Sequence, residues 1–191
     1  MPADFLLPTP EVARRLIGAY LLRATPDGWV RCRILETEAY LSVGDPASHS
    51  HQGQTPRNAP MFGLPGTSYV YFTYGSCHCL NVVTQAAGMG EAVLIRAVEP
   101  VDGGDWLSAN RPISDRRQLT NGPGKLCQAL ALDRGHNGLD LLGGTVLRLE
   151  PGPAPPVVAV GRRVGISRAV DLPLRFVWPG HPGVSRPRLA P

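Results

Sequence analysis

The sequence predicts an α+β domain with a mixed, mainly antiparallel sheet. Segments with strand-like composition outnumber segments with helical periodicity, and turns connect them in place of regular helical crossovers. The chain of 191 residues contains 22 Gly and 20 Pro, which favours short elements joined by loops. No internal repeat or linker divides it, so we expect one domain over residues 1–191.

The N-terminal segment is expected to form a helix followed by a hairpin. Thr-Pro-Glu at residues 9–11 provides a capping hydroxyl, a proline at the first helical position and an acid in the first turn. Four apolar or aromatic residues then fall on one helical face: Val12, Leu16, Ile17 and Tyr20. Strand-like residues 21–24 and 29–34 flank a Thr-Pro-Asp-Gly turn, and the second strand continues into ETEAY at 36–40.

The middle of the chain combines a long loop with its most aromatic strand. Residues 42–68 are rich in Gly, Pro, Ser, His and Gln without periodicity, and long loops inside compact domains are usually functional. Strands are predicted over residues 69–74, 79–84 and 92–98, with Gly75 permitting the first turn between them.

The last part of the chain should contain one helix and three strands. A basic connector over residues 106–117 leads to Asn-Gly-Pro-Gly at 121–124, which precedes a short helix through 125–130. The three strands are expected near residues 145–149, 157–160 and 174–178. A Pro- and Arg-rich tail follows.

Positive charge is concentrated in the second half of the chain. Residues 101–191 hold 12 Lys plus Arg against 7 acids, whereas residues 1–100 hold 7 Arg against 8 acids. This imbalance fits contact with phosphates.

The sequence has no leader-like opening and no apolar run approaching about 18 residues, so we expect a cytoplasmic protein with no membrane partner. We also expect its four cysteines to be free thiols.

Glu36 and Glu38 are the first candidates for catalysis. They leave a strand two residues apart, so both share a face with Tyr40 if the extended geometry continues. A carboxylate beside an aromatic platform suits hydrolysis of a base or sugar bond. Two alternatives stay open here: a solvated pair at a strand end, and the paired carboxylates of a glycoside hydrolase.

Two short clusters of His and Cys, at residues 49–51 and 77–79, raise the question of a metal. Zinc knuckles normally use Cys-x2-Cys spacing, and three adjacent strand side chains cannot reach one ion. We therefore expect no metal site, with Cys77 and Cys79 on one strand face and His78 on the other.

The tyrosines of the aromatic strand allow two interpretations. Alternation places Tyr69 and Tyr71 on one face and leaves Tyr74 at the strand end beside Gly75. They could pack a core. Alternatively, an inward aromatic stacks on an extruded base while a residue at the hairpin tip wedges into the minor groove.

Six segments of the sequence form a recognisable combination: ETEAY (36–40), HSHQGQTPRN (49–58), MFGLPGTSYVYFTYG (61–75), CLNVV (79–83), VLIRAVEP (93–100) and NGPGKLCQAL (121–130). Together they resemble the alkyladenine (3-methyladenine) DNA glycosylase family. They follow the family order and span a core of about residues 10–178. The resemblance implies a single domain with a curved antiparallel sheet and no metal or organic cofactor.

The same resemblance implies a monofunctional enzyme, which we expect to act as a monomer on double-stranded DNA in the bacterial nucleoid. It would flip out alkylated or deaminated purines and hydrolyse their N-glycosidic bonds. The substrate class comprises 3-methyladenine, 7-methylguanine, hypoxanthine and ethenoadenine. Glu38 matches the general base, and Arg96 matches the arginine that helps to hold the water and a nearby phosphate.

Five further residues match binding positions of the family. Tyr40, His49 and Tyr71 match residues packed around the flipped base, and His49 also hydrogen-bonds it. Asn81 matches the residue that disfavours the exocyclic amine of guanine, and Tyr74 matches the one that fills the gap in the duplex. The sequence departs from some relatives at Ser-Cys-His (76–78), which puts minor-groove contact and duplex affinity in doubt.

Two rival functions remain. Removal of Met1 would expose the secondary amine of Pro2, and Lys125 supplies the chain's one lysine amine, so a lyase that forms a Schiff base is the nearer rival. The other is a noncatalytic binder of damaged nucleic acid that retains the aromatic wedge.

Overall fold

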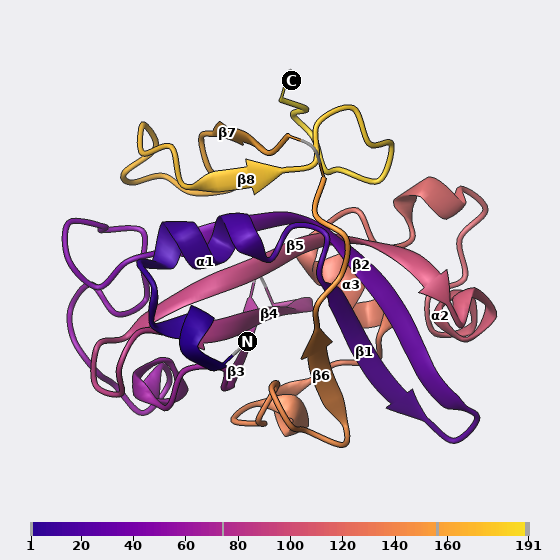
Figure 1. Ribbon diagram of the computed structural model, residues 1–191, viewed down its shortest axis with the longest axis horizontal. Coiled ribbons are helices and arrows are strands. Elements are labelled where there is room, and N and C mark those ends of the chain that lie inside the picture. The colour runs from indigo at the N-terminus through magenta and orange to yellow at the C-terminus, as the bar shows by residue number, and fades with distance from the viewer. Residues whose placement is uncertain (1, 74, 156, 190–191) are drawn as a thin grey trace.

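The computed structural model describes residues 2–73, 75–155 and 157–189, and over these residues one eight-stranded antiparallel sheet organises the chain (Figure 1). The strands are β1 Tyr20–Thr25, β2 Gly28–Tyr40, β3 Ser68–Thr73, β4 Cys77–Thr84, β5 Glu91–Asp102, β6 Leu147–Glu150, β7 Ala159–Gly161 and β8 Arg175–Val177. Their order is β3-β4-β5-β2-β1-β6, and β8 pairs with both β2 and β7. The α+β fold with a curved, mainly antiparallel sheet is confirmed.

The helices of the described residues are short. They are α1 Thr9–Arg15, α2 Gly104–Asn110 and α3 Pro123–Ala129, with 3-10 turns η1 Pro2–Leu6, η2 Ala59–Phe62, η3 Arg116–Gln118 and η4 Arg134–His136. The predicted connector over 106–117 was wrong at its start, because α2 covers that part. The long loop predicted over 42–68 contains one helical turn, η2, and the last residue of that predicted loop, Ser68, is the first residue of β3.

The first helix differs from its prediction in two details. The Thr9 hydroxyl contacts Thr84 at 2.7 Å and donates to Glu91 at 2.5 Å, and the N-cap position is Pro8. Tyr20 begins β1, because the helix ends at Arg15 and Gly18, with a φ of +92°, turns the chain into the strand.

Strand β2 is central and carries a bulge that decides which side chains face the core. β5 pairs along one edge, while β1 and then β8 pair along the other. The register shifts between Ile34 and Glu36. Ile34 belongs to the main core before the shift and Ala39 after it, so alternation is displaced by one residue. Glu36 and Glu38 therefore turn away from that core.

The main core lies between the sheet and the helices. It includes Phe5, Val12, Leu16, Ile17, Ile34, Val82, Ile95, Leu126, Leu130 and Leu149. Part of the predicted tail also packs on the sheet, since Val184 is buried with Leu35 and Val177. The four cysteines are unpaired.

Candidate active site

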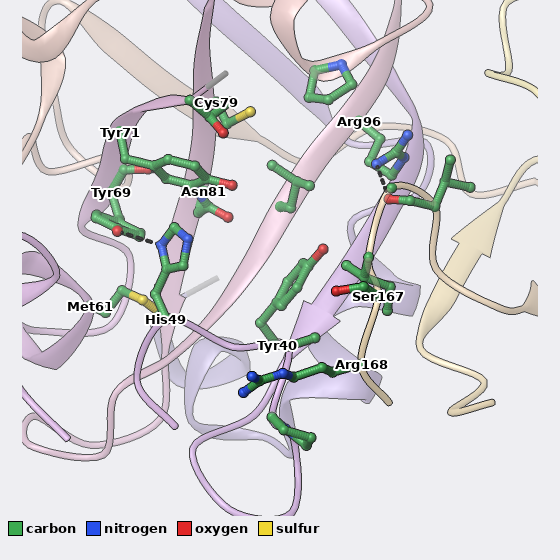
Figure 2. Close-up of a pocket in the computed structure, with 18 residues that line it drawn as sticks. Tyr40, His49, Met61, Tyr69, Tyr71, Cys79, Asn81, Arg96, Ser167 and Arg168 are labelled. Carbon is green, nitrogen blue, oxygen red and sulfur yellow. Dashed lines mark hydrogen bonds between the residues drawn. The ribbon is translucent and has the colours of Figure 1, made fainter. Parts of the chain in front are cut away.

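A cavity of about 420 Å³ is lined by residues of β2, β3, β4 and β5 and of the loops beside them. Figure 2 shows Tyr71, His49 and Asn81 on one side of it and Tyr40 and Arg96 on the other. All five were predicted from the sequence, and the structure brings them together. The volume falls within the range of small-molecule sites, about 300–1,000 Å³.

One wall of the cavity is a cluster of aromatic rings. His49 lies edge-on to Tyr71, with ring centroids 4.5 Å apart, and Tyr69 lies 5.3 Å from Tyr71. His49 Nδ1 lies 2.8 Å from the Tyr69 hydroxyl. Burial, assisted by the charge of Arg57, lowers the pKa of His49, so its imidazole is neutral near pH 7. The Asn81 amide donates to the Tyr69 carbonyl oxygen at 3.0 Å, which fixes its side chain in this wall.

The loop after β2 holds His49 through one buried asparagine. Asn58 Nδ2 donates to the carbonyl oxygens of His49 at 2.7 Å and of Gly53 at 3.0 Å. Its Oδ1 accepts from the backbone N–H of Thr55 at 2.6 Å. Asn58 is 2% exposed, so these bonds satisfy a buried amide and link parts of the loop to one another. They hold the backbone of His49, while its imidazole ring lines the cavity.

Glu38 lies directly behind the opposite wall. Its Oε2 accepts from Arg96 Nη1 at 3.3 Å and from the Tyr40 hydroxyl at 2.9 Å, and its Oε1 accepts from the Val164 N–H at 2.7 Å. Glu38 has no exposed surface, whereas these three partners line the cavity. Burial raises the pKa of Glu38 above its usual range, although Arg96, Val164 and Tyr40 oppose this shift.

Glu36 occupies a different environment from Glu38. Its Oε1 accepts from Arg96 Nε at 3.0 Å, Arg175 Nε at 2.8 Å and Ser185 Oγ at 2.8 Å. Its Oε2 accepts from the Ser185 N–H at 2.8 Å. The solvated-pair interpretation is wrong, because both glutamates are fully buried. The four donors also leave Glu36 poorly suited to be the second carboxylate of a glycoside hydrolase.

Comparison with known families agrees with this site. Residues 3–182 match the family described as methylpurine-DNA glycosylase. The chain belongs to this family. Membership makes it a DNA glycosylase, an enzyme that hydrolyses N-glycosyl bonds in DNA, and confirms the family expected from the sequence.

Three relatives provisionally named 3-methyladenine DNA glycosylases illustrate the similarity. The Methanocella arvoryzae protein is 44% identical, with 97% of this chain and 96% of the relative aligned. The Carboxydothermus hydrogenoformans protein is 46% identical over 92% of both chains. The Synechococcus sp. (strain JA-3-3Ab) protein is 46% identical over 93% of this chain and 94% of its own.

The segment that follows β7 is part of the site, although it was not predicted from the sequence. Val164, Gly165, Ile166, Ser167 and Arg168 line the cavity. Figure 2 shows Ser167 and Arg168 on the same side as Tyr40. The preceding Arg163 and its partner Asp45 were missed as well, although the run GRRVGISR (161–168) combines three arginines with glycines.

Several other expectations concern positions away from the cavity. Tyr74 lies outside the described residues, so its role stays a prediction. Lys125 lines a separate groove and donates to Asn121 Oδ1 at 2.8 Å, which gives no support to a Schiff base in the cavity.

Within the described ranges, no three His, Cys, Asp or Glu form a metal-binding group, and no helix is long and apolar enough to cross a membrane.

Proposed function

We propose that this glycosylase releases alkylated or deaminated purines from double-stranded DNA, with Glu38 as the general base. One observation carries the proposal: Glu38 is hydrogen-bonded to Arg96, Tyr40 and Val164, and all three line a cavity whose facing wall is aromatic. The purines proposed are 3-methyladenine, 7-methylguanine, hypoxanthine and ethenoadenine.

The arrangement of the walls suits a flipped, flat base. Such a base would stack between Tyr40 and the cluster of Tyr71 and His49. A purine alkylated at N3 or N7 carries positive charge, and a cation over an aromatic face gains about 0.5–2 kcal/mol. This preference is modest, so the weaker glycosidic bond and easier unstacking of damaged nucleotides must supply more of the selectivity.

Breaking the glycosidic bond builds positive charge on the sugar, and a nearby carboxylate stabilises that charge and activates water. Oε1 of Glu38 accepts one bond, from Val164, and a carboxylate oxygen can accept a second, here from the water. Since Glu38 has no exposed surface, nucleotide docking must displace the wall formed by Tyr40 and Val164 slightly. Arg96 would then hold the water and a nearby phosphate.

DNA contact would extend beyond the cavity. We propose that Tyr74 fills the gap left by the flipped nucleotide and that the protein acts as a cytoplasmic monomer on the nucleoid. A Tyr74→Ala variant should lower the population of the flipped state. Unchanged fluorescence of a 2-aminopurine reporter beside the lesion would contradict this role.

Replacement of Glu38 by Gln tests the general base. Loss of a general base should slow single-turnover release of hypoxanthine by about 10²- to 10⁴-fold, while binding to abasic-site DNA persists. Glu99→Gln is the matched control, because Glu99 pairs with His181 at 3.2 Å and does not line the cavity. Near-normal release by the Glu38 variant would defeat the assignment, and borohydride trapping on abasic DNA would reveal the lyase alternative.

A further inference from the structure

We propose that the buried ion pair between Arg163 and Asp45 is a positioning device for the general base. It holds the ring of Tyr40 and the backbone amide of Val164 against Glu38. Its catalytic consequence rests on the function proposed above, while its geometry concerns residues outside the predicted site.

The pair itself is closely fixed. Arg163 Nη1 lies 2.6 Å from Asp45 Oδ2, and Nη2 lies 2.6 Å from Oδ1, so the contact is bidentate. Both side chains have no exposed surface. Nη1 also donates to the Ala39 carbonyl oxygen at 3.1 Å, which ties the guanidinium to β2 between Glu38 and Tyr40. A bidentate contact restricts orientation as well as distance.

The guanidinium of Arg163 supports Tyr40. Its Cζ lies 4.6 Å from the centroid of the Tyr40 ring. Tyr40 lines the cavity and Arg163 does not, so the guanidinium lies behind the ring that would receive a base. The Tyr40 hydroxyl reaches Glu38 at 2.9 Å, so displacement of the ring would also disturb the carboxylate.

The backbone of the next residue makes the second connection. The Val164 N–H donates to Glu38 at 2.7 Å, and the Val164 carbonyl oxygen accepts from Arg96 at 3.4 Å. Asp45 is itself fixed by the backbone N–H groups of Leu41 at 3.1 Å and Ala47 at 3.2 Å. The pair therefore joins the loop after β2 to the segment after β7, on either side of the carboxylate.

A purely stabilising role is the competing explanation. Replacing a buried ion pair with apolar residues is often neutral or stabilising, because desolvation offsets the attraction. Stability alone therefore gives little reason for a bidentate pair at this place. Positioning predicts an effect on Glu38 that unfolding temperature does not report.

The titration of Glu38 provides that separate signal. The charge of Glu38 interacts with Arg96 on β5, with Glu36 and Tyr40 on β2, and with Cys79 on β4. Its carboxylate also accepts from the Val164 N–H. The Val164 and Tyr40 hydrogen bonds both lower the pKa of Glu38. If Arg163 positions them, substitution of Arg163 should raise that pKa further while the other groups stay in place.

Two variants test the proposal. Arg163→Lys keeps the charge but cannot make the bidentate contact, and Asp45→Asn with Arg163→Met removes the buried charges together. The matched control is Arg162→Lys, because Arg162 is 73% exposed and pairs with Asp171 at 2.7 Å. The measurements are single-turnover hypoxanthine release against pH, affinity for abasic-site DNA and the unfolding temperature.

Both Arg163 variants should release base at least about tenfold more slowly at neutral pH, since small misplacement of catalytic groups costs up to about 10²-fold. Their acidic limb should move to higher pH, and the control should match the wild type. A lower unfolding temperature with unchanged rate and pH profile would overturn the proposal. If the double variant does not fold, the same criteria applied to Arg163→Lys decide.

A readout independent of activity separates this inference from the proposed function. The Glu38 carboxyl carbon can be titrated by ¹³C NMR and assigned by its loss in Glu38→Gln. A higher pKa in Arg163→Lys than in the wild type supports positioning even if no base is released. An unchanged titration contradicts it even if the wild type is an active glycosylase.

Discussion

The guanidinium of Arg96 donates through Nε to Oε1 of Glu36 at 3.0 Å. The same guanidinium reaches Glu38 through Nη1 at 3.3 Å. The alternating pattern of ETEAY does not distinguish these two carboxylates, yet their surroundings in the structure differ. Glu36 accepts four donors and fixes Arg96, whereas Glu38 accepts three and adjoins the cavity. Their neutral replacements should therefore have opposite consequences.

Glu36→Gln should destabilise the protein, and Glu38→Gln should not. Glu36 pairs with two buried guanidinium groups, those of Arg96 and Arg175, whereas Glu38 pairs with Arg96 alone. Removing one partner of a buried ion pair costs about 3–5 kcal/mol, because the other charge is left buried, and Glu36→Gln would leave the Arg175 charge in that state. For a chain of this size, each kcal/mol lowers the unfolding temperature by about 2–4 °C. Calorimetry should show a fall of roughly 10 °C for Glu36→Gln.

The sign for Glu38 follows from its raised pKa. A carboxyl with a raised folded-state pKa contributes stability below its unfolded pKa and loses it as pH rises through the folded value. Ionisation of Glu38 in the folded state is therefore a cost to stability, which Gln removes. Equal destabilisation by the two variants at neutral pH would refute this distinction.

The pH dependence of base release should follow the same group. A general base must be ionised, so release should decline as pH falls through the raised pKa of Glu38, above the ordinary glutamate value of about 4.3. Hypoxanthine is the suitable substrate, because it stays neutral across the acidic range. Single-turnover rates should show this limb in the wild type and lose it in the residual activity of Glu38→Gln.

The sequence was sufficient to predict the strands and the shared face of Glu36, Glu38 and Tyr40, because alternation is a local property. The bulge between Ile34 and Glu36 was not predicted. It depends on pairing with β5 and β8, which are distant in sequence. The prediction succeeded because the next shift, between Glu36 and Thr37, places its extra residue, Arg96, on β5 and leaves the alternation of Glu36, Glu38 and Tyr40 along β2 intact.

The ion pair of Asp45 and Arg163 shows what sequence reasoning could not reach. The two residues are 118 positions apart and belong to segments without periodic pattern. An arginine in a basic run usually indicates a solvated surface, and only tertiary packing buries Arg163 while leaving Arg162 exposed. Arg175 and Ser185, which donate to Glu36, were missed because they lie 139 and 149 positions from it in the sequence.

Tyr40 should separate stacking from electrostatics. Tyr40→Phe keeps the ring but removes the hydroxyl that contacts Glu38 at 2.9 Å and lowers its pKa. The acidic limb should therefore move to higher pH while lesion binding persists. Tyr40→Leu removes the ring, and binding of a cationic base should weaken by about 0.5–2 kcal/mol. Identical pH profiles for wild type and Phe variant would exclude the hydroxyl as an influence on Glu38.

Asn81 should determine how the cavity treats the 2-amino group of guanine. Its Nδ2 donates to the Tyr69 carbonyl oxygen at 3.0 Å, so the amide is held in the wall and cannot easily turn away. An exocyclic amine placed against this fixed group would meet a steric conflict. Asn81→Ser shortens the side chain and should raise release of 7-methylguanine relative to hypoxanthine, by about 10-fold if one such contact decides.

Hypoxanthine provides the internal control, because it lacks the 2-amino group. Its release by Asn81→Ser should stay equal to the wild type or decrease, and release of undamaged guanine should become measurable in long incubations. Parallel changes for both bases would instead indicate a general change in cavity shape. The ratio of the two single-turnover rates, measured in the same flanking sequence, therefore decides whether Asn81 acts on the amine itself.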